Sequence, residues 1–353
     1  MVTRMGFLAQ FAAIDVIAFS AMENHLHLLL RTHPEVVSRW SDREVALRKS
    51  LLLGAKKVKP SSKAPIDAAA KLEMQISAIL CAPKRVCKAR EDLSSLGFFH
   101  KLLKEPCARM WNREDKVTGH LWDARFKSPK VLDQRAIETV AGYIELNEIY
   151  ACAANSIPSS TWSSGHVQWR RLCEAIPKTC DEAAKANVDP RAQLLQLRWE
   201  PVFPCNMMSL EGSGDGVIQA QAPMDTDQQE HPPQPSLLAH MHRVDQAGRR
   251  ERPDKSGCIA KTEPGAVNAA IAHGLALLSR EAPLVRRAFQ RVAAWWETTS
   301  KALSAEMGGM SLDEVAWNSI REGHGSCYGS KASVGIEVAR RGQRWMVPVW
   351  SSA

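Results

Sequence analysis

The chain has 353 residues, enough for two or three domains, and its 45% apolar and 24% charged residues are typical of a protein that folds in water. The formal net charge of +8 at pH 7 favours an anionic partner, which leaves nucleic acids and acidic membrane surfaces open. The chain has no run of about 18 apolar residues, so no membrane span is predicted. Its nine cysteines are scattered and include no C-x-x-C pair, which argues against a disulfide framework and a zinc knuckle and favours a reducing cytoplasm.

The first 31 residues predict a short helix followed by a β-hairpin. Two apolar runs, at 14–20 and 25–31, are separated by a few turn residues, which is the pattern of two antiparallel strands. The apolar start superficially resembles an export signal, but Asp15 interrupts it and no clear cleavage site follows. We therefore expect the chain to stay in the cytoplasm.

Residues 48–90 predict an inserted, solvated basic segment. They hold eleven Lys and Arg residues against two acidic residues, and prolines punctuate them, so we expect helix only in the part after Asp67. A serine at position 94 or 95 is a good N-cap for a helix that runs towards Trp111. Pro106 lies inside this helix and is expected to kink or split it.

The remaining chain predicts one more strand and helix, then weaker signals. The sequence GHLWDARFKSPKVL, at 119–132, favours a turn and a strand, and Asp133 is placed to cap a helix. We expect a helical and irregular extension at 157–210. Many Gln, Pro and Gly residues predict a disordered linker at 211–262. The last part, 263–353, is expected to be a small, mainly helical C-terminal region of unknown role.

His25 and His27 stand one residue apart at the front of the second predicted strand. Side chains alternate along a strand, so both imidazoles project from one face, with Leu26 on the other. Two neutral imidazoles at this spacing can bind one divalent ion, provided that a third ligand comes from elsewhere in the chain. The alternative is a pair of ordinary core or surface histidines, since a chain with eleven histidines produces such spacings by chance.

Tyr143 and Asn147 could supply the missing parts from the helix after Asp133. Their spacing of four residues places both side chains on one helical face, and Tyr150 falls on that face too. A phenol can attack a phosphodiester and form a covalent intermediate that keeps the bond energy for rejoining. A divalent ion on two imidazoles and an amide oxygen would polarise the same phosphate. The alternative is a tyrosine that anchors the helix and an asparagine near its end.

Three motifs, taken together, resemble the HUH-type single-strand DNA transposases, in the branch of the REP-associated tyrosine transposases. The chain shows ENHLHLLLR at 23–31, GHLWDARFKS at 119–128 and YIELN at 143–147. The branch pattern is N-H-x-H-L-L, then G-x-x-W-x-x-R-F-K-S, then Y-I-x-x-N-P, and the resemblance covers about residues 9–155. The matching residues are Asn24, His25, His27, Leu28, Leu29, Gly119, Trp122, Arg125, Phe126, Lys127, Ser128, Tyr143, Ile144 and Asn147.

The resemblance implies an α+β, ferredoxin-like fold, in which an antiparallel sheet lacks its first strand and carries helices on one face. It implies that His25, His27 and Asn147 bind a divalent cation, Mg²⁺ or Mn²⁺. Tyr143 becomes the catalytic nucleophile, which cleaves single-stranded DNA through a 5′-phosphotyrosine link and leaves a free 3′-OH. Tyr150 competes for this role, but it stands where the family usually has an arginine.

Four residues are expected to hold DNA, namely Arg31, Trp122, Arg125 and Lys127. Arg125 and Lys127 alternate onto one face of their predicted strand, where they could bind phosphates, the contacts that dominate nucleic-acid affinity. Trp122 could stack on a base, although core packing is an equal alternative. The expected partner is single-stranded or hairpin DNA at the nucleoid and no membrane, with the protein acting as a monomer or a homodimer.

The motifs also depart from the family pattern. Glu148 replaces a proline and Tyr150 an arginine, which removes positive charge and adds negative charge beside the proposed phosphate site. The strand that the family places before this chain's start is not found, and the C-terminal sequence SVGIEVARRGQRWMVPVW could supply a substitute strand. A second interpretation therefore stays open, in which an inactive or domesticated relative binds hairpin DNA without cutting it.

Overall fold

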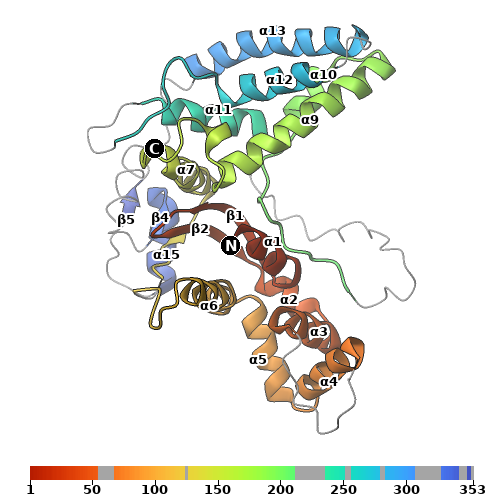
Figure 1. Cartoon of the computed structure of the whole chain (residues 1–353), viewed down its shortest axis with the longest axis vertical. Coiled ribbons are helices and arrows are strands. Elements are labelled where there is room, and N and C mark those ends of the chain that lie inside the picture. The colour runs from red at the N-terminus through yellow and green to blue at the C-terminus, as the bar shows by residue number, and fades with distance from the viewer. Residues whose placement is uncertain are drawn as a thin grey trace. The chain divides into compact units, whose positions relative to one another are not determined.

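The computed structural model divides the chain into two compact units. The described residues are 1–54, 67–123, 126–210, 235–250, 256–278, 283–306, 327–341 and 348–350. Unit 1 comprises Met1–Ile17, Leu30–Phe126 and Phe203–Glu230, and unit 2 comprises Ala18–Leu29, Lys127–Val202 and His231–Ala353. The units interleave along the chain, whereas the sequence predicts consecutive domains. The predicted α+β class is confirmed, because a two-stranded antiparallel sheet is combined with helices and a mostly helical C-terminal region (Figure 1).

The β-hairpin predicted near the N-terminus is present, with β1 at Ile14–Ala21 and β2 at Leu26–Thr32. Its turn is closed by a hydrogen bond from the Met22 amide to the His25 carbonyl, 2.9 Å long. β1 is buried along nearly all its length, as expected for a run of β-branched and aromatic residues. The edge of β1 that does not pair with β2 forms backbone hydrogen bonds with Phe203 within unit 1 and with Trp162 within unit 2.

Unit 1 is mainly helical in its described residues. Its helices are α1 (Val2–Phe11), α2 (Pro34–Arg39), α3 (Asp42–Leu53), α4 (Ala68–Leu80), α5 (Pro83–Leu93) and α6 (Leu96–Glu114). Ser95 caps α6, as predicted, because its hydroxyl accepts a hydrogen bond from the Phe98 amide. Of the kink or split predicted at Pro106, the split does not occur, and the kink stays a prediction. α6 is continuous, and the buried Phe99, Leu103 and Cys107 line one stripe across the proline, so packing holds both halves in one helix.

The basic segment at 48–90 is only partly solvated. Helix α4 follows Asp67 as predicted, and residues 55–66 lie outside the described residues. Arg48, however, is fully buried, and its Nε donates to Glu44 Oε1 at 2.5 Å. Its guanidinium also donates to the carbonyls of Asn206 and Met208. The predicted solvation fails here because this arginine has a carboxylate and two carbonyls as internal partners.

Unit 2 holds the remaining elements. The helices are α7 (Gln134–Glu145), α8 (Asn147–Tyr150), the 3₁₀ turn Ile157–Ser159, α9 (Ser164–Ala186), α10 (Pro190–Gln196), α11 (Leu237–Gly248), α12 (Ala266–Leu277), α13 (Pro283–Glu306) and α15 (Lys331–Arg341). α9, α12 and α13 pack side by side (Figure 1). The close approach of α12 to α13 requires Gly274, where a Cβ atom would lie 2.6 Å from the Phe289 ring. Among the described helices, none is long and apolar enough to cross a membrane.

Helix α11 corrects the prediction of a disordered linker at 211–262. Ser236 caps this helix, and Leu237, Met241 and Val244 are buried. Their spacing is that of an apolar helical stripe, which the surrounding Gln and Pro residues obscured. The rest of the predicted linker is divided: 211–234 and 251–255 lie outside the described residues, so disorder there stays a prediction.

A second, parallel sheet joins distant parts of unit 2. It has the order β3 (Lys130–Val131), β4 (Cys327–Gly329) and β5 (Pro348–Trp350). Of the turn and strand predicted within 119–132, the strand is observed only at Lys130–Val131 among the described residues. Gly119 has a positive φ of 125°, and Trp122 contacts Lys104 of α6 from an irregular segment. The C-terminal sequence forms α15 and β5, which pairs with β4 and does not replace a strand beside the histidines.

Candidate functional site

The structure brings His25, His27 and Tyr143 together within unit 2. The two imidazole rings lie 4.8 Å apart in an edge-to-face arrangement. The His27 ring lies 6.1 Å from the Tyr143 ring, at an interplanar angle of 89°. His25 is exposed at the start of β2, whereas Tyr143 on α7 is only 6% exposed. The predicted meeting of a histidine strand with a tyrosine helix is thus observed.

Asn24 orients the first of these imidazoles. Its Oδ1 atom lies 2.5 Å from Nδ1 of His25, so Nδ1 carries the proton and donates it. The lone pair of the neutral ring is then on Nε2. A metal-binding histidine commonly donates its other ring nitrogen to an oxygen in this way, which fixes the tautomer. His25 is therefore in a state suited to binding a cation.

Buried polar contacts hold α7, and with it Tyr143, in place. Asp133 caps the helix by accepting a hydrogen bond from the Ala136 amide, as predicted. Glu145 is fully buried and contacts Nε2 of His240 at 2.9 Å and the Ser164 hydroxyl at 3.3 Å. The His240 ring stacks on Trp199 with centroids 4.3 Å apart. Sequence reasoning missed this anchor, since its members come from separate segments with no local motif.

Asn147 is tied to the same helix and is 5% exposed. Its Nδ2 donates to the carbonyl of Tyr143 at 2.9 Å and to that of Ile144 at 3.4 Å. These bonds fix the amide plane. The other amide atom, Oδ1, is an oxygen, which is the type of ligand that a hard cation prefers. The structure shows His27 in contact with His25 and with Tyr143, and the place of Asn147 as third ligand stays a prediction.

The other two tyrosines are both buried. Tyr150, the rival nucleophile, is 2% exposed in α8. Tyr328 lies on β4, which packs against α7, and sequence reasoning gave it no role. Burial, and then the neighbouring Tyr143 hydroxyl, raise the pKa of Tyr328. Tyr328 thus lies near Tyr143, although no local pattern in the sequence indicates it.

Glu148, which departs from the family pattern, is buried. It is 4% exposed, and its Oε1 has no hydrogen-bond partner. Burial raises the pKa of its carboxyl above the ordinary 4.5, although the Trp162 amide and the Ser160 hydroxyl favour the ionised form. The residue expected to add negative charge beside the phosphate is therefore a buried carboxyl group with a raised pKa.

Replacing Glu148 by Gln should change the pH dependence of stability. Because the folded-state pKa is raised, this group stabilises the folded chain fully below its unfolded pKa, and that contribution is lost as the pH rises through the folded pKa. Glutamine stays neutral throughout. The free energy of unfolding of Glu148→Gln relative to the wild type should therefore rise by about 1 kcal/mol between about pH 4 and pH 7. Urea titrations at both pH values measure it, and parallel pH profiles of the two proteins would rule out a buried carboxyl.

The predicted DNA-binding residues fall in both units. Arg125 lies outside the described residues, and Lys127 is exposed in unit 2. Arg31 on β2 and Trp122 are half-buried in unit 1. Lys127 lies outside the strands and Arg125 outside the described residues, so their alternation on one strand face stays a prediction.

Trp122 lines an open pocket of about 430 Å³ between α6 and the segment 119–126. The Lys104 ammonium lies 4.5 Å from the centre of the Trp122 ring, and the Trp111 ring lies 6.3 Å away. His100 stacks on Phe126 with centroids 4.1 Å apart. Burial, and then the Lys104 charge, lower the pKa of His100 to about 4, so this ring is neutral at pH 7. Aromatic faces next to lysines are the groups on which unpaired bases and phosphates bind.

Comparison with protein-family models, with curated proteins and with solved structures finds no match for this chain. The functional argument therefore depends on the chemistry of the named residues.

Proposed function

We propose that this protein is a metal-dependent single-stranded DNA endonuclease and transposase, which cleaves and rejoins DNA through a 5′-phosphotyrosine intermediate. The observation that carries the proposal is the pair of imidazoles, His25 and His27, beside the ring of Tyr143. This combination joins two neutral nitrogen ligands to a phenol, the parts that phosphodiester transfer by a tyrosine needs.

A divalent cation, Mg²⁺ or Mn²⁺, would be held by His25, His27 and Asn147 and would polarise the scissile phosphate. The phenol oxygen of Tyr143 attacks the phosphorus, and the bond from phosphorus to the 3′ oxygen breaks. The departing 3′ oxygen gains a proton and the phenol loses one, so no external energy source is required. Attack by another 3′-OH on the phosphotyrosine reverses the step and joins two strands.

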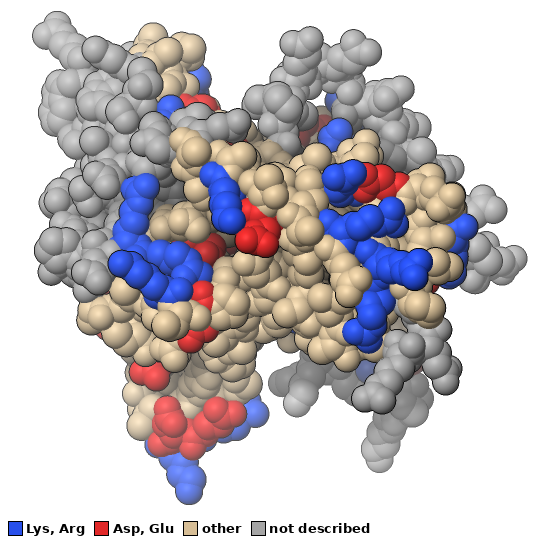
Figure 2. All heavy atoms as spheres, turned by 90° about the horizontal axis from the view of Figure 1, so that it is seen from above, with Lys and Arg blue, Asp and Glu red and all other residues tan. Residues whose placement is uncertain are grey.

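The basic and aromatic groups support DNA as the substrate. Lys127 is exposed in the same unit as Tyr143, and the pocket at Trp122 offers stacking surfaces next to Lys101, Lys104 and Arg109. On the face drawn in Figure 2, Lys and Arg side chains gather in groups with Asp and Glu beside them. Such clustering favours local phosphate contacts over a uniform attraction, and backbone contacts supply most nucleic-acid affinity.

The second candidate is a protein that binds hairpin DNA without cutting it. The low exposure of Tyr143 and Asn147, 6% and 5%, favours this alternative, because a nucleophile has to reach its phosphate. The two candidates differ in one measurable respect. Only the enzyme requires the histidines for its activity, whereas the binding protein keeps its DNA affinity without them.

The test is cleavage of hairpin-flanked single-stranded DNA with Mn²⁺ or Mg²⁺. His27→Ala should reduce cleavage at least about a hundredfold. Removing a residue that only hydrogen-bonds a metal ligand already reduces activity by up to about a hundredfold, and His27 is proposed as a ligand itself. His273→Ala, which changes an exposed histidine on α12, is the matched control and should cleave like the wild type. Full cleavage by His27→Ala would contradict the metal role, and binding without cleavage by the wild type would leave the binding protein.

A further inference from the structure

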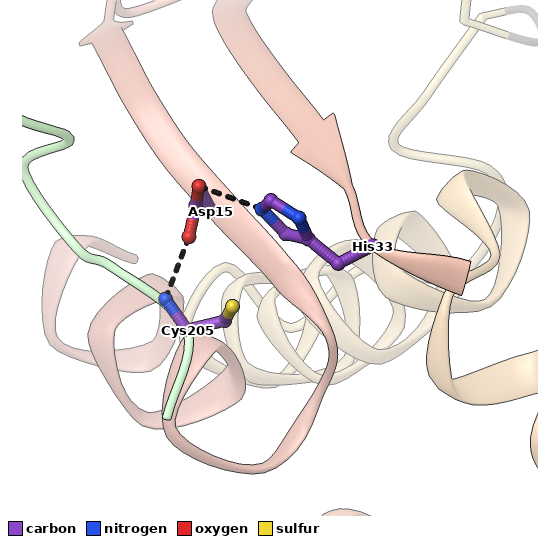
Figure 3. A group of neighbouring side chains, drawn as sticks. All are labelled: Asp15, His33 and Cys205. Carbon is purple, nitrogen blue, oxygen red and sulfur yellow. Dashed lines mark hydrogen bonds and ion pairs between the residues drawn. The ribbon is translucent and has the colours of Figure 1, made fainter. Parts of the chain in front are cut away.

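Asp15, His33 and Cys205 form a second cluster, entirely within unit 1. Asp15 lies on β1, His33 directly follows β2, and Cys205 belongs to the segment that pairs with β1 through Phe203 (Figure 3). Their potential ligand atoms all lie within 4.8 Å of one another. Among the described residues, this is the one group of three His, Cys, Asp or Glu side chains so arranged.

The cluster is shielded from water on most sides. Asp15 is 5% exposed, Cys205 is 8% exposed, and the His33 side chain is 12% exposed. An aspartate, a histidine and a cysteine placed together inside a protein are unusual, since charged groups are rarely buried without a partner or a metal. The small remaining exposure of His33 gives an ion a way in.

Two of the three groups, the His33 ring and the Asp15 carboxylate, are oriented by further hydrogen bonds. Nε2 of His33 faces Asp15 Oδ2 at 2.8 Å, while its Nδ1 lies 3.0 Å from Glu35 Oε1. The other oxygen of Asp15 accepts a hydrogen bond of 2.8 Å from the Cys205 amide. A histidine that binds a metal with one nitrogen and donates the other to a carboxylate is the usual arrangement in zinc proteins, and ligating carboxylates are themselves hydrogen-bonded.

An ion pair between Asp15 and His33 explains only part of this arrangement. Burial acts against both charges, yet the contact with His33 lowers the pKa of Asp15, and the contact with Asp15 raises that of His33. The Cys205 thiol also hydrogen-bonds the Asp15 carboxylate, which further lowers the pKa of Asp15. Burial, and then Asp15, raise the pKa of Cys205, so without a metal the thiol keeps its proton beside a carboxylate. A divalent ion would use all three groups at once.

We propose that Asp15, His33 and Cys205 bind one Zn²⁺ ion. Zinc takes cysteine sulfur, histidine nitrogen and carboxylate oxygen in tetrahedral sites, with bonds of about 2.0–2.3 Å. The 2.8 Å contact between Asp15 Oδ2 and His33 Nε2 would open to admit the ion. The thiol and the ring nitrogen each release a proton to solvent as their bonds to the ion form. The soft thiolate of Cys205, which the transfer site lacks, favours Zn²⁺ over Mg²⁺ and Mn²⁺ here.

Zinc content of the purified full-length protein tests the proposal. After growth with zinc and gel filtration, we expect about one ion per chain, and Cys205→Ser and Asp15→Asn should each retain less than about a tenth of it. Cys152→Ser, which changes an exposed thiol, is the matched control and should keep the full amount. His27→Ala should also keep it, which separates this site from the proposed transfer site.

Cobalt provides a measurement that does not depend on a variant folding well. Wild-type protein loaded with Co²⁺ should show the intense near-ultraviolet band of a cobalt–thiolate bond and the visible bands of tetrahedral cobalt. Absence of the thiolate band, or a zinc content near zero in the wild type, would overturn the proposal. The same holds if folded Cys205→Ser, checked by circular dichroism, keeps its zinc. A loss of DNA cleavage in the wild type with zinc still bound would count only against the proposed function.

Discussion

Tyr143→Phe is expected to abolish the covalent link between protein and DNA, with no detectable adduct where the wild type forms one. The change removes a single oxygen, which is the atom that attacks the phosphate. The aromatic ring stays, so the edge-to-face contact with His27 at 6.1 Å and the packing of α7 should persist. Wild type and variant are incubated with hairpin-flanked single-stranded DNA and Mn²⁺, and the adduct is measured by denaturing gel and mass spectrometry.

The other two tyrosines make this experiment decisive. Tyr150→Phe changes a buried tyrosine three residues after Asn147 in α8 and should leave the adduct intact. Tyr328→Phe tests the tyrosine that lies near Tyr143 on β4, and it should also leave the adduct intact. An adduct that persists in Tyr143→Phe and disappears in either of the other variants would move the nucleophile there. DNA affinity, measured separately, should change little in all three.

Arg48→Met is expected to lower the free energy of unfolding by about 3–5 kcal/mol, the cost of removing one partner from a buried ion pair. Glu44 is 1% exposed and would lose the guanidinium that contacts it at 2.5 Å, although the Leu210 amide still donates to it. The carbonyls of Asn206 and Met208 would also lose a donor, and Trp40 would lose the cation that lies 4.1 Å from its ring centre. Urea unfolding followed by circular dichroism measures the loss.

Arg43→Met is the matched control. Arg43 lies on the same helix and forms an ion pair with Glu73, but both side chains are about half exposed. Its loss should change stability by less than about 0.5 kcal/mol. In Arg48→Met/Glu44→Gln, removal of the stranded charge should restore part of the stability. A loss below about 1 kcal/mol in Arg48→Met would show that water reaches this pair.

The parts of the fold that sequence reasoning found are those with local signals. The hairpin follows from two apolar runs and a turn, and α7 follows from Asp133 and an apolar stripe. The meeting of His25 and His27 with Tyr143 required both the alternation of a strand and the resemblance to a transposase pattern. The strand predicted before Lys130 is not observed in the described residues. An alternating pattern favours a strand, but Gly119 has a positive φ and Phe126 stacks on His100 of α6.

The remaining site residues depend on contacts between distant segments. Glu145 meets His240, and Asp15 meets Cys205, only after the chain has folded. Tyr328 reaches Tyr143 through a short strand whose neighbours in the sheet come from two other regions. None of these pairs has a spacing or composition that a single sequence reveals. The burial of Arg48 could not be predicted either, because an arginine in a basic stretch looks like a solvated residue in the local sequence.

A shortened protein that stops at residue 156 would retain all three transposase motifs, yet it would lose the imidazole that Glu145 contacts at 2.9 Å. It would also lose Ser164, the other partner of that carboxylate. An acid left alone among apolar side chains costs about 1–3 kcal/mol or more, and here it sits two residues from the tyrosine. Anyone seeking a minimal version of this protein should therefore keep the chain at least through Gly248, where α11 ends.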